Sequence, residues 1–161
     1  MVKNEEVDFG IGSFAEGDSV IETTPLFTDH MRVVVPRESL LARKRTVRLK
    51  DLVNAPLILM DPQTSVRMLV DRAFQSIGHF PSPAFEVTYM SSAVGMVRAG
   101  LGVAFLPSAG LEISEMSGLV SRPVNHAGLT RKIVAVQRAR RQLSPAAAKF
   151  LAALVAASKN Y

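Results

Sequence analysis

The chain has 161 residues, of which 48% are apolar and 20% charged, a composition typical of an ordered globular protein rather than a disordered one. It contains no cysteine, which excludes disulfides and cysteine-based zinc sites, and its three histidines are too scattered to predict another metal site. No apolar stretch is long enough to cross a bilayer and the first ten residues lack the apolar stretch of a signal peptide, so we expect a cytoplasmic protein without membrane contact.

The formal net charge of +5 is unevenly distributed along the chain. Residues 1–30 contain seven acidic residues and one lysine, whereas residues 116–161 contain eight Lys or Arg and no acid. A basic chain can bind nucleic acid, but neither a DNA-reading motif nor aromatic residues interleaved with the basic ones support that interpretation here. We therefore favour the alternative, in which the acidic start and the basic end pack together in one lobe.

The first third of the chain favours extended structure. Residues 7–13 alternate briefly and then reach glycines, which predicts a short buried strand followed by a loop. Residues 20–36 predict two extended segments, the second of which ends at Pro36. The basic stretch 37–52 predicts one or two short helical turns and is the first candidate for a linker between lobes. The apolar run 56–61 is typical of a strand that is covered on both faces.

The clearest helix is predicted over residues 65–77. Thr64 or Ser65 is placed to cap its start, and Gly78 is placed to end it. Its solvent face should carry Arg67, Asp71, Arg72 and Gln75. Its apolar residues recur at helical spacing and form one stripe: Val66, Leu69, Val70, Ala73, Phe74 and Ile77.

The second half of the chain alternates strands and helices. Strands are predicted at 84–89, 102–107 and 132–137, a helix at 91–100, and a long alanine-rich helix that begins at Ser144 and Pro145. Short connections between them predict an α/β fold with a largely parallel sheet.

One connection in that half is dense in glycine and proline. Gly100 should end a helix, Gly102 should permit a tight entry into the next strand, and Pro107 should end that strand at the edge of the sheet.

Ligands of open α/β sheets bind beyond the carboxyl ends of the strands, where helix N-termini offer unpaired N–H groups. Three predicted loops should lie there, at residues 12–14, 61–65 and 90–92, and all carry hydroxyl or small side chains that suit a small anion such as a carboxylate. The plainer alternative is that these Ser and Thr residues only cap helices. Residues 105–108 are interpreted as a buried strand end and, in addition, as an apolar wall of the ligand cleft.

The segments VDFGIGS, PLFTDHMRVVVP, LKDLVNAPLILMDPQTSVRMLVDRAF, FEVTYMSSAVGMVRAGLGVAFLPS and LSPAAAKFLAAL occur in the order seen in one known family. As a set they resemble the effector-binding domain of LysR-type transcriptional regulators. The resemblance implies a fold like that of the type 2 periplasmic binding proteins, with two Rossmann-like lobes, a first from residues 1–43 and 127–161 and a second from 44–126. It implies effector contacts at these positions: Ser13, Gln63, Thr64, Ser65, Ser92 and Phe105.

The chain departs from the family pattern at its start. Family members begin with a helix-turn-helix DNA-binding domain, and their effector domain begins with a further strand, helix and strand before the VDFGIGS region. We therefore expect a truncated chain with an incomplete first lobe, which lacks sequence-specific DNA affinity of its own. Because the family associates through this domain, we expect a homo-oligomer, with apolar surface left uncovered at several residues: Val7, Phe9, Ile11, Phe150 and Leu154.

The functional prediction is an effector-sensing module without catalysis, metal or cofactor. A solute-binding protein of the same fold is the alternative, although it would need a signal peptide. An enzyme is disfavoured because the sequence shows neither a nucleophile motif nor paired carboxylates in a loop. The effector itself stays open among small carboxylates, aromatic acids and amino-acid derivatives.

Overall fold

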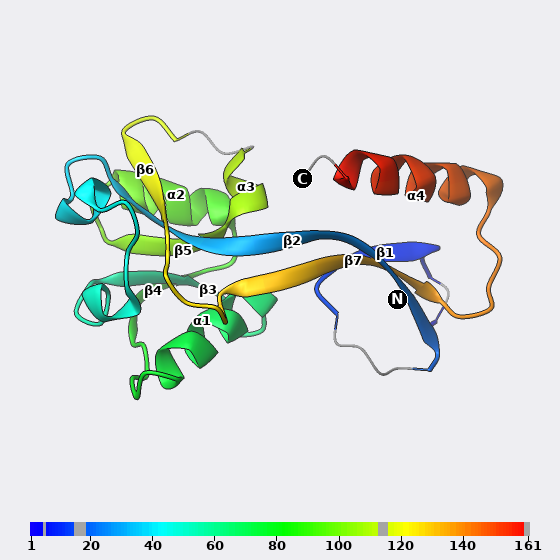
Figure 1. The fold of residues 1–161 in the computed structure, drawn as a ribbon, viewed down its shortest axis with the longest axis horizontal. Helices are drawn as coiled ribbons and strands as arrows, with labels where there is room; N and C mark the ends of the chain where they lie inside the picture. Colours follow the sequence, from blue (N-terminus) through cyan, green and yellow to red (C-terminus); the bar gives the residue numbers. More distant parts are fainter. Residues whose placement is uncertain (5, 15–18, 113–115, 160–161) are drawn as a thin grey trace. The chain divides into compact units, whose positions relative to one another are not determined.

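The chain is divided into two compact units, as seen in the computed structural model of residues 1–4, 6–14, 19–112 and 116–159 (Figure 1). The first unit combines Met1–Asp29 with Arg131–Tyr161, and the second unit is the continuous stretch His30–Thr130. The acidic start thus shares the first unit with residues 131–161 of the basic end, whereas Arg122 belongs to the second unit. The expected lobe boundaries, after residues 43 and 126, both fall inside the second unit.

The first unit pairs the two ends of the chain through strands. Strand β1 (Phe9–Gly12) lies antiparallel to β7 (Thr130–Arg138), with Phe9 opposite Gln137. The prediction of a buried first strand is wrong, because β1 is only half-buried and 52% of Ile11 is exposed. Helix α4 (Pro145–Ser158) begins as predicted, with the Ser144 hydroxyl accepting a hydrogen bond from the N–H of Ala147 at 3.2 Å.

Ion pairs join the acidic and basic segments within the first unit. The carboxylate of Asp29 is buried and receives two N–H groups of Arg131, at 2.9 and 3.2 Å. Asp8 and Arg141 form a more exposed pair at 3.5 Å. Burial of Asp29 removes it from water, so its charge requires this partner.

Strand β2 (Ile21–Pro36) is a single strand of 16 residues, so the prediction of two extended segments is wrong. The strand continues through Pro25, although proline has no N–H to donate. In the described registers β5 and β6 pair with β2 only from Met31 onward. Pro25 lies before those pairings, so its missing N–H costs no hydrogen bond to β5 or β6.

The second unit is built on a mixed sheet with β3 (Leu57–Met60) between two parallel neighbours, β4 (Pro83–Val87) and β5 (Val103–Pro107). On the other side of β5, the sheet continues antiparallel through β2 and β6 (Leu119–Pro123). Helices α1 (Ser65–Gln75) and α2 (Met90–Arg98) cover opposite faces (Figure 1). Every residue of β3 and β5 is therefore buried, as the apolar runs predict.

The basic stretch 37–52 belongs to the second unit, and the prediction of a linker there is wrong. It contains the expected helical turns, two short 3₁₀ helices, η1 (Leu40–Arg43) and η2 (Leu49–Asp51). Val47, Leu49 and Leu52 are buried in the main core, which anchors the stretch to the sheet.

Two glycines play the parts that the sequence predicts. Gly100 follows α2 with a φ of +76°, the left-handed conformation that ends many helices. Gly102 leaves no room for a side chain, because a Cβ atom there would lie 2.2 Å from the carbonyl oxygen of Pro56. The next amide, that of Val103, donates to this same carbonyl at 2.9 Å. The close approach sets the register at which β5 enters the sheet.

Helix α3 (Ser108–Glu112) and strand β6 are elements that we did not predict. In the described part of the chain, no helix combines the length and the apolar character needed to cross a membrane.

Candidate functional site

The carboxyl ends of β3, β4 and β5 meet at one edge of the second unit, because these three strands are parallel. The chain leaves this edge at Asp61, Thr88 and Ser108. The amide of Asp61 donates to the carbonyl of Val87 at 2.9 Å and ties the first two exits together. This is the edge where ligands of open α/β sheets bind.

Thr64 is first of all a helix cap. Its hydroxyl accepts a hydrogen bond from the N–H of Arg67 at 3.2 Å and donates to the carbonyl of Asp61 at 2.8 Å. Gln63 is exposed, and its N–H donates to the carboxylate of Asp61 at 2.9 Å. Ser65, half-buried, is the first residue of α1. The cap prediction for Thr64 is confirmed, and this loop is folded around its own backbone.

Ser92 does not lie in a loop, contrary to the prediction. Helix α2 begins at Met90, with Tyr89 as its N-cap, so Ser92 stands in the first turn. Its amide donates to the carbonyl of Tyr89 at 3.1 Å, and its side chain is exposed. The strand before it also ends earlier than predicted, at Val87.

Phe105 lies in the core of the second unit rather than on a surface. Only 1% of it is exposed, and its ring packs edge-on against Phe74 with centroids 5.9 Å apart. The ring therefore packs in the core next to the carboxyl edge and does not line its surface. Ser13 follows β1 in the first unit and is exposed, whereas the other five predicted contacts all belong to the second unit.

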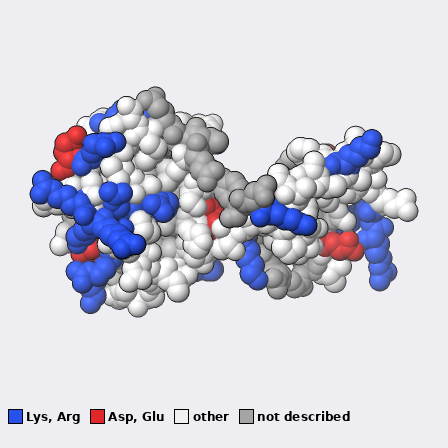
Figure 2. Space-filling view, turned by 45° about the horizontal axis from the view of Figure 1, so that its top comes forward, with Lys and Arg blue, Asp and Glu red and all other residues white. Residues whose placement is uncertain are grey.

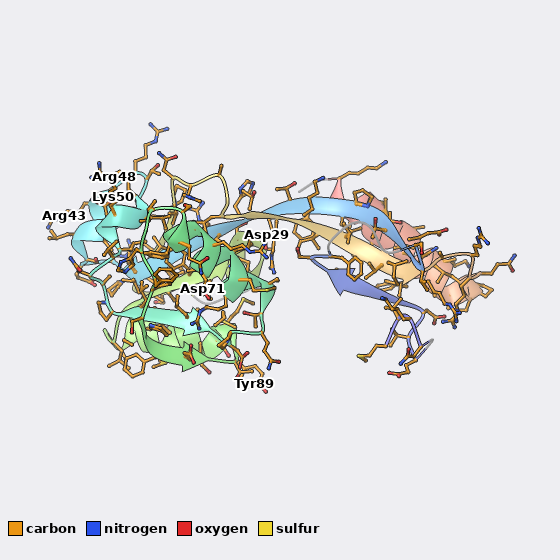
Figure 3. All side chains as sticks on the ribbon, turned by 90° about the horizontal axis from the view of Figure 1, so that it is seen from below. Asp29, Arg43, Arg48, Lys50, Asp71 and Tyr89 are labelled. Atoms are coloured by element: carbon orange, nitrogen blue, oxygen red, sulfur yellow. The ribbon has the colours of Figure 1, made fainter. Side chains whose placement is uncertain are left out.

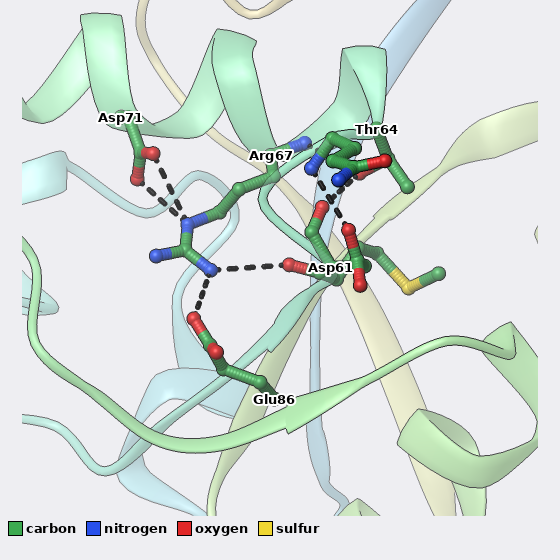
Figure 4. Close-up of polar contacts among 7 residues, drawn as sticks. Asp61, Thr64, Arg67, Asp71 and Glu86 are labelled. Carbon is green, nitrogen blue, oxygen red and sulfur yellow. Dashed lines mark hydrogen bonds and ion pairs between the residues drawn. The ribbon is translucent and has the colours of Figure 1, made fainter.

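Arg67 is buried, which overturns the prediction that it lies on the solvent face of α1. Its guanidinium donates to the carboxylates of Asp71, at 3.0 and 3.1 Å, and of Glu86, and to the carbonyl of Met60 at 3.2 Å (Figure 4). Burial alone lowers the pKa of Arg67, but the hydrogen bonds to Glu86 and Asp71 outweigh it and raise that pKa above its usual value. Two carboxylates neutralise this cation, so it offers little attraction to an anionic ligand.

Arg32 is a cation at this edge that sequence reasoning missed. From β2 its Nε donates to the hydroxyl of Ser121 at 3.0 Å and its Nη2 to the carbonyl of Ser121 at 3.3 Å. The residue is half-buried, and its Nη1 has no hydrogen bond to any described residue. One signal was present in the sequence, because Arg32 is the single charged residue in the otherwise apolar run MRVVVP.

Arg32 and Ser108 line two adjacent pockets of the second unit. One has a volume of about 180 Å³ and is also lined by His30 and His126, and the other of about 330 Å³ also contains Ser121. The ring of His126 is engaged, since Nδ1 accepts from the N–H of Gly128 at 3.1 Å and Nε2 lies 2.9 Å from the hydroxyl of Ser76. Arg32, His30 and the serine hydroxyls therefore remain as groups that can bind an anion here.

No three His, Cys, Asp or Glu side chains gather as metal ligands in the described ranges of the chain. Among the described residues, this edge offers hydrogen-bonding groups and the partly free guanidinium of Arg32.

A family model described as the LysR substrate binding domain matches residues 1–159. The chain is 29% identical over 150 residues to the uncharacterized HTH-type transcriptional regulator YbhD of Escherichia coli (strain K12), a match that covers 93% of this chain and 47% of YbhD. It is 27% identical over 150 residues to the transcriptional dual regulator GltC of Bacillus subtilis (strain 168), covering 92% and 50%. The chain thus spans about half the length of the curated relatives it matches.

Solved structures match the fold over 99% of the chain. The regulatory domain of Synechocystis PCC6803 CcmR, in complex with 2-PG, superposes with a TM-score of 0.87 at 21% identity and is covered to 77%. The effector binding domain of QuiR in complex with shikimate gives 0.81 at 25% identity and is covered to 76%. The predicted α/β fold of the periplasmic-binding-protein kind is confirmed.

Proposed function

The chain belongs to the LysR substrate-binding domain family, and from that premise we propose that it senses a small-molecule effector and passes the signal to a helix-turn-helix DNA-binding domain. The observation that carries the proposal is the match of the family model to residues 1–159, nearly the whole chain. Effector binding would then control DNA binding or transcription by the complete regulator.

The alternative with the same fold is a solute-binding protein that works in transport. The relatives YbhD and GltC are named as transcriptional regulators, which favours sensing over transport. For the same reason we propose that the chain has no catalytic role and acts in the cytoplasm as part of a homo-oligomeric regulator.

The effector that we propose is a small carboxylate. The structures of QuiR and BenM carry shikimate and benzoate, both small organic acids, in their effector-binding domains. In this chain the carboxyl edge of the second unit presents hydroxyl groups and the guanidinium of Arg32. A carboxylate can accept two parallel hydrogen bonds from such a group.

Within the second unit, Arg32 suits the carboxylate better than Arg67 does. Arg67 is neutralised by Asp71 and Glu86, whereas the side-chain hydrogen bonds that Arg32 makes with described residues go to the uncharged Ser121. We propose that Arg32 and Ser108 bind the carboxylate. The remainder of the effector would meet residues that follow the strands of the second unit, with Phe105 as support from the core: Gln63, Thr64, Ser65 and Ser92.

The test is a thermal-shift screen of the chain against shikimate, benzoate and a panel of other small acids. A ligand at about 100 times its Kd stabilises the folded state by about 2.7 kcal/mol, which gives a clear rise in Tm. Arg32→Gln should weaken binding of the best acid by about tenfold or more, because a charged hydrogen bond contributes about 1.5–3 kcal/mol. Arg72→Gln, at an exposed arginine of the same unit, is the matched control.

Two further arms make this test decisive. Arg32→Lys keeps the positive charge but loses the two hydrogen bonds to Ser121. If this variant still binds the acid in part, the charge itself contributes to binding, independently of the contact with Ser121. Equal affinities of the Gln variants at 32 and 72 would rule out Arg32 as the carboxylate partner. A screen in which amino-acid derivatives without a free carboxylate stabilise the chain and no acid does would contradict the proposed ligand class.

A further inference from the structure

The stretch that carries η1 and η2 presents a strongly basic surface. Six exposed or half-exposed cations lie within 14 residues, and only two acids, Glu38 and Asp51, accompany them. Figure 2 shows Lys and Arg side chains gathered on the second unit, and Figure 3 labels three of them, Arg43, Arg48 and Lys50, around the two turns. We call this surface the basic face and define it by its cations: Arg37, Arg43, Lys44, Arg45, Arg48 and Lys50.

Most of the charge on the basic face is not compensated within the protein. Asp51 pairs with Lys44 at 2.8 Å and with Arg48 at 3.3 Å, so one carboxylate serves both cations. The side chains of the remaining four cations make no ion pair or hydrogen bond with any residue that the structure describes: Arg37, Arg43, Arg45 and Lys50. Like charges held this close repel one another, so the arrangement costs stability unless an anion binds there.

The scaffold beneath the basic face is fixed. The amide of Val47 donates to the carbonyl of Pro123 at 2.9 Å, and the carbonyl of Val47 accepts from the amide of Asn125 at 2.9 Å. Arg122 crosses from β6 and donates twice to the carbonyl of Ala42, at 3.1 and 2.7 Å. Because the backbone is held at Ala42 in η1 and at Val47 between the two turns, an anionic partner need not order it there, and the free energy cost of binding is smaller.

We propose that the basic face binds the phosphate backbone of duplex DNA without reading its sequence. Three of the four uncompensated cations are arginines, whose planar guanidinium groups match phosphate oxygens. The chain has no aromatic residue between Phe27 and Phe74, so this face lacks the stacking platform that single-stranded nucleic acid requires. This inference adds a second binding surface to the proposed effector sensor. It rests on the proposed function in one respect, since the sensing domain of a DNA-binding regulator is held close to DNA.

The binding should be weak and strongly dependent on salt. Each phosphate that a protein cation neutralises contributes about −0.9 to the slope of log affinity against log salt. If four cations each bind one phosphate, raising the salt concentration from about 50 to 200 mM should lower the affinity roughly 100-fold.

The experiment measures fluorescence anisotropy of a labelled duplex of roughly 20 base pairs of scrambled sequence, titrated with this chain at several salt concentrations. The triple variant R43E/R45E/K50E should lose at least about tenfold in affinity and flatten the salt slope by about 2–3. The control is R72E/K149E/K159E, which changes three exposed cations elsewhere and alters net charge by the same amount. It should keep most of the affinity. Thermal melts verify that both variants fold.

Three outcomes would overturn the proposal. Equal weakening of the two triple variants would mean that net charge alone attracts DNA. Failure of the unaltered chain to bind duplex at about 50 mM salt would remove the basis for the basic face as a DNA surface. Tighter binding to vesicles of phosphatidylserine than to duplex at equal salt would assign the face to membranes instead. None of these outcomes touches effector sensing, which the thermal shift with small acids reports separately on the same variants.

Discussion

Phe74 of α1 and Phe105 of β5 meet edge-on in the core of the second unit, with ring centroids 5.9 Å apart and ring planes at 78°. Phe74 is fully buried and 1% of Phe105 is exposed, so neither ring contacts water to any useful extent. Edge-to-face packing of this kind contributes about 0.5–1.5 kcal/mol beyond the burial of apolar area. The pair joins the helix on one face of the sheet to a fully buried strand.

The first prediction concerns this contact. Phe74→Ala should lower the free energy of unfolding by about 3–5 kcal/mol, because it removes a fully buried ring and leaves a cavity. Arg72→Ala, two residues earlier on the exposed side of α1, should change it by less than about 0.5 kcal/mol. Urea denaturation followed by circular dichroism compares the two, and similar losses would mean that the buried face of α1 is wrongly assigned.

The second prediction contrasts two glycines. Gly102→Ala should destabilise the protein because its Cβ would collide with the Pro56 carbonyl, which belongs to backbone and cannot move aside cheaply. Gly95, within α2, has no atom within 4 Å of a Cβ position. Gly95→Ala should therefore stabilise by about 0.4–1 kcal/mol through its higher helix propensity. Melting temperatures that move in the same direction for both variants would contradict the close approach at residue 102.

The third prediction concerns pH. The hydrogen bond from Lys44, followed by that from the N–H of Arg48, lowers the pKa of Asp51 far below its ordinary value. A carboxyl group with a lowered folded-state pKa stabilises the protein above its unfolded pKa of about 3.9, and that stabilisation is lost as the pH falls toward the folded pKa. The difference in Tm between the unaltered chain and Asp51→Asn should be constant from about pH 5 to 7 and shrink below about pH 4.

Glu38→Gln is the control for this pH series, since Glu38 is an exposed acid in the same basic stretch. If its Tm difference follows the same curve, the effect belongs to the overall charge and not to the hydrogen bonds of Asp51.

The fourth prediction is self-association through the first unit. No residue of α4 is buried, and Phe150 and Ile11 are 59% and 52% exposed beside a groove of about 520 Å³. Exposed apolar residues that gather at one groove favour contact with another protein surface. Light scattering over a concentration series should give a mass above the 17.4 kDa of the monomer. Ile11→Lys should shift it toward the monomer, whereas Phe80→Lys, at a more exposed apolar side chain in the second unit, should not.

The sequence predicts most regular elements because each has a local signal. Strands β3 and β5 are continuous apolar runs, and the start of α4 carries its cap and its proline side by side. Strand β6, LVSRP, neither alternates nor forms a continuous apolar run, and the five residues of α3 are too few to show a helical period.

The candidate site was harder to predict, because its polar contacts join distant residues. Helical spacing assigned Arg67 to the solvent, but its partner Glu86 lies 19 residues away on β4 and pulls the guanidinium inward. Arg32 and Ser121 are separated by 89 residues and meet only because β2 and β6 pair. No pattern within a single segment carries that information. The hydroxyl of Thr64 was found because capping is local.

The division of the chain into one continuous and one discontinuous unit affects how the protein is made. Residues 30–130 leave the ribosome as one stretch and can fold as soon as they emerge, whereas the first unit needs both ends of the chain. Phe9 pairs with Gln137, so β1 is synthesised long before its partner strand. We therefore expect the second unit to form first during synthesis, while the edge of β1 is still unpaired and accessible to neighbouring nascent chains or chaperones.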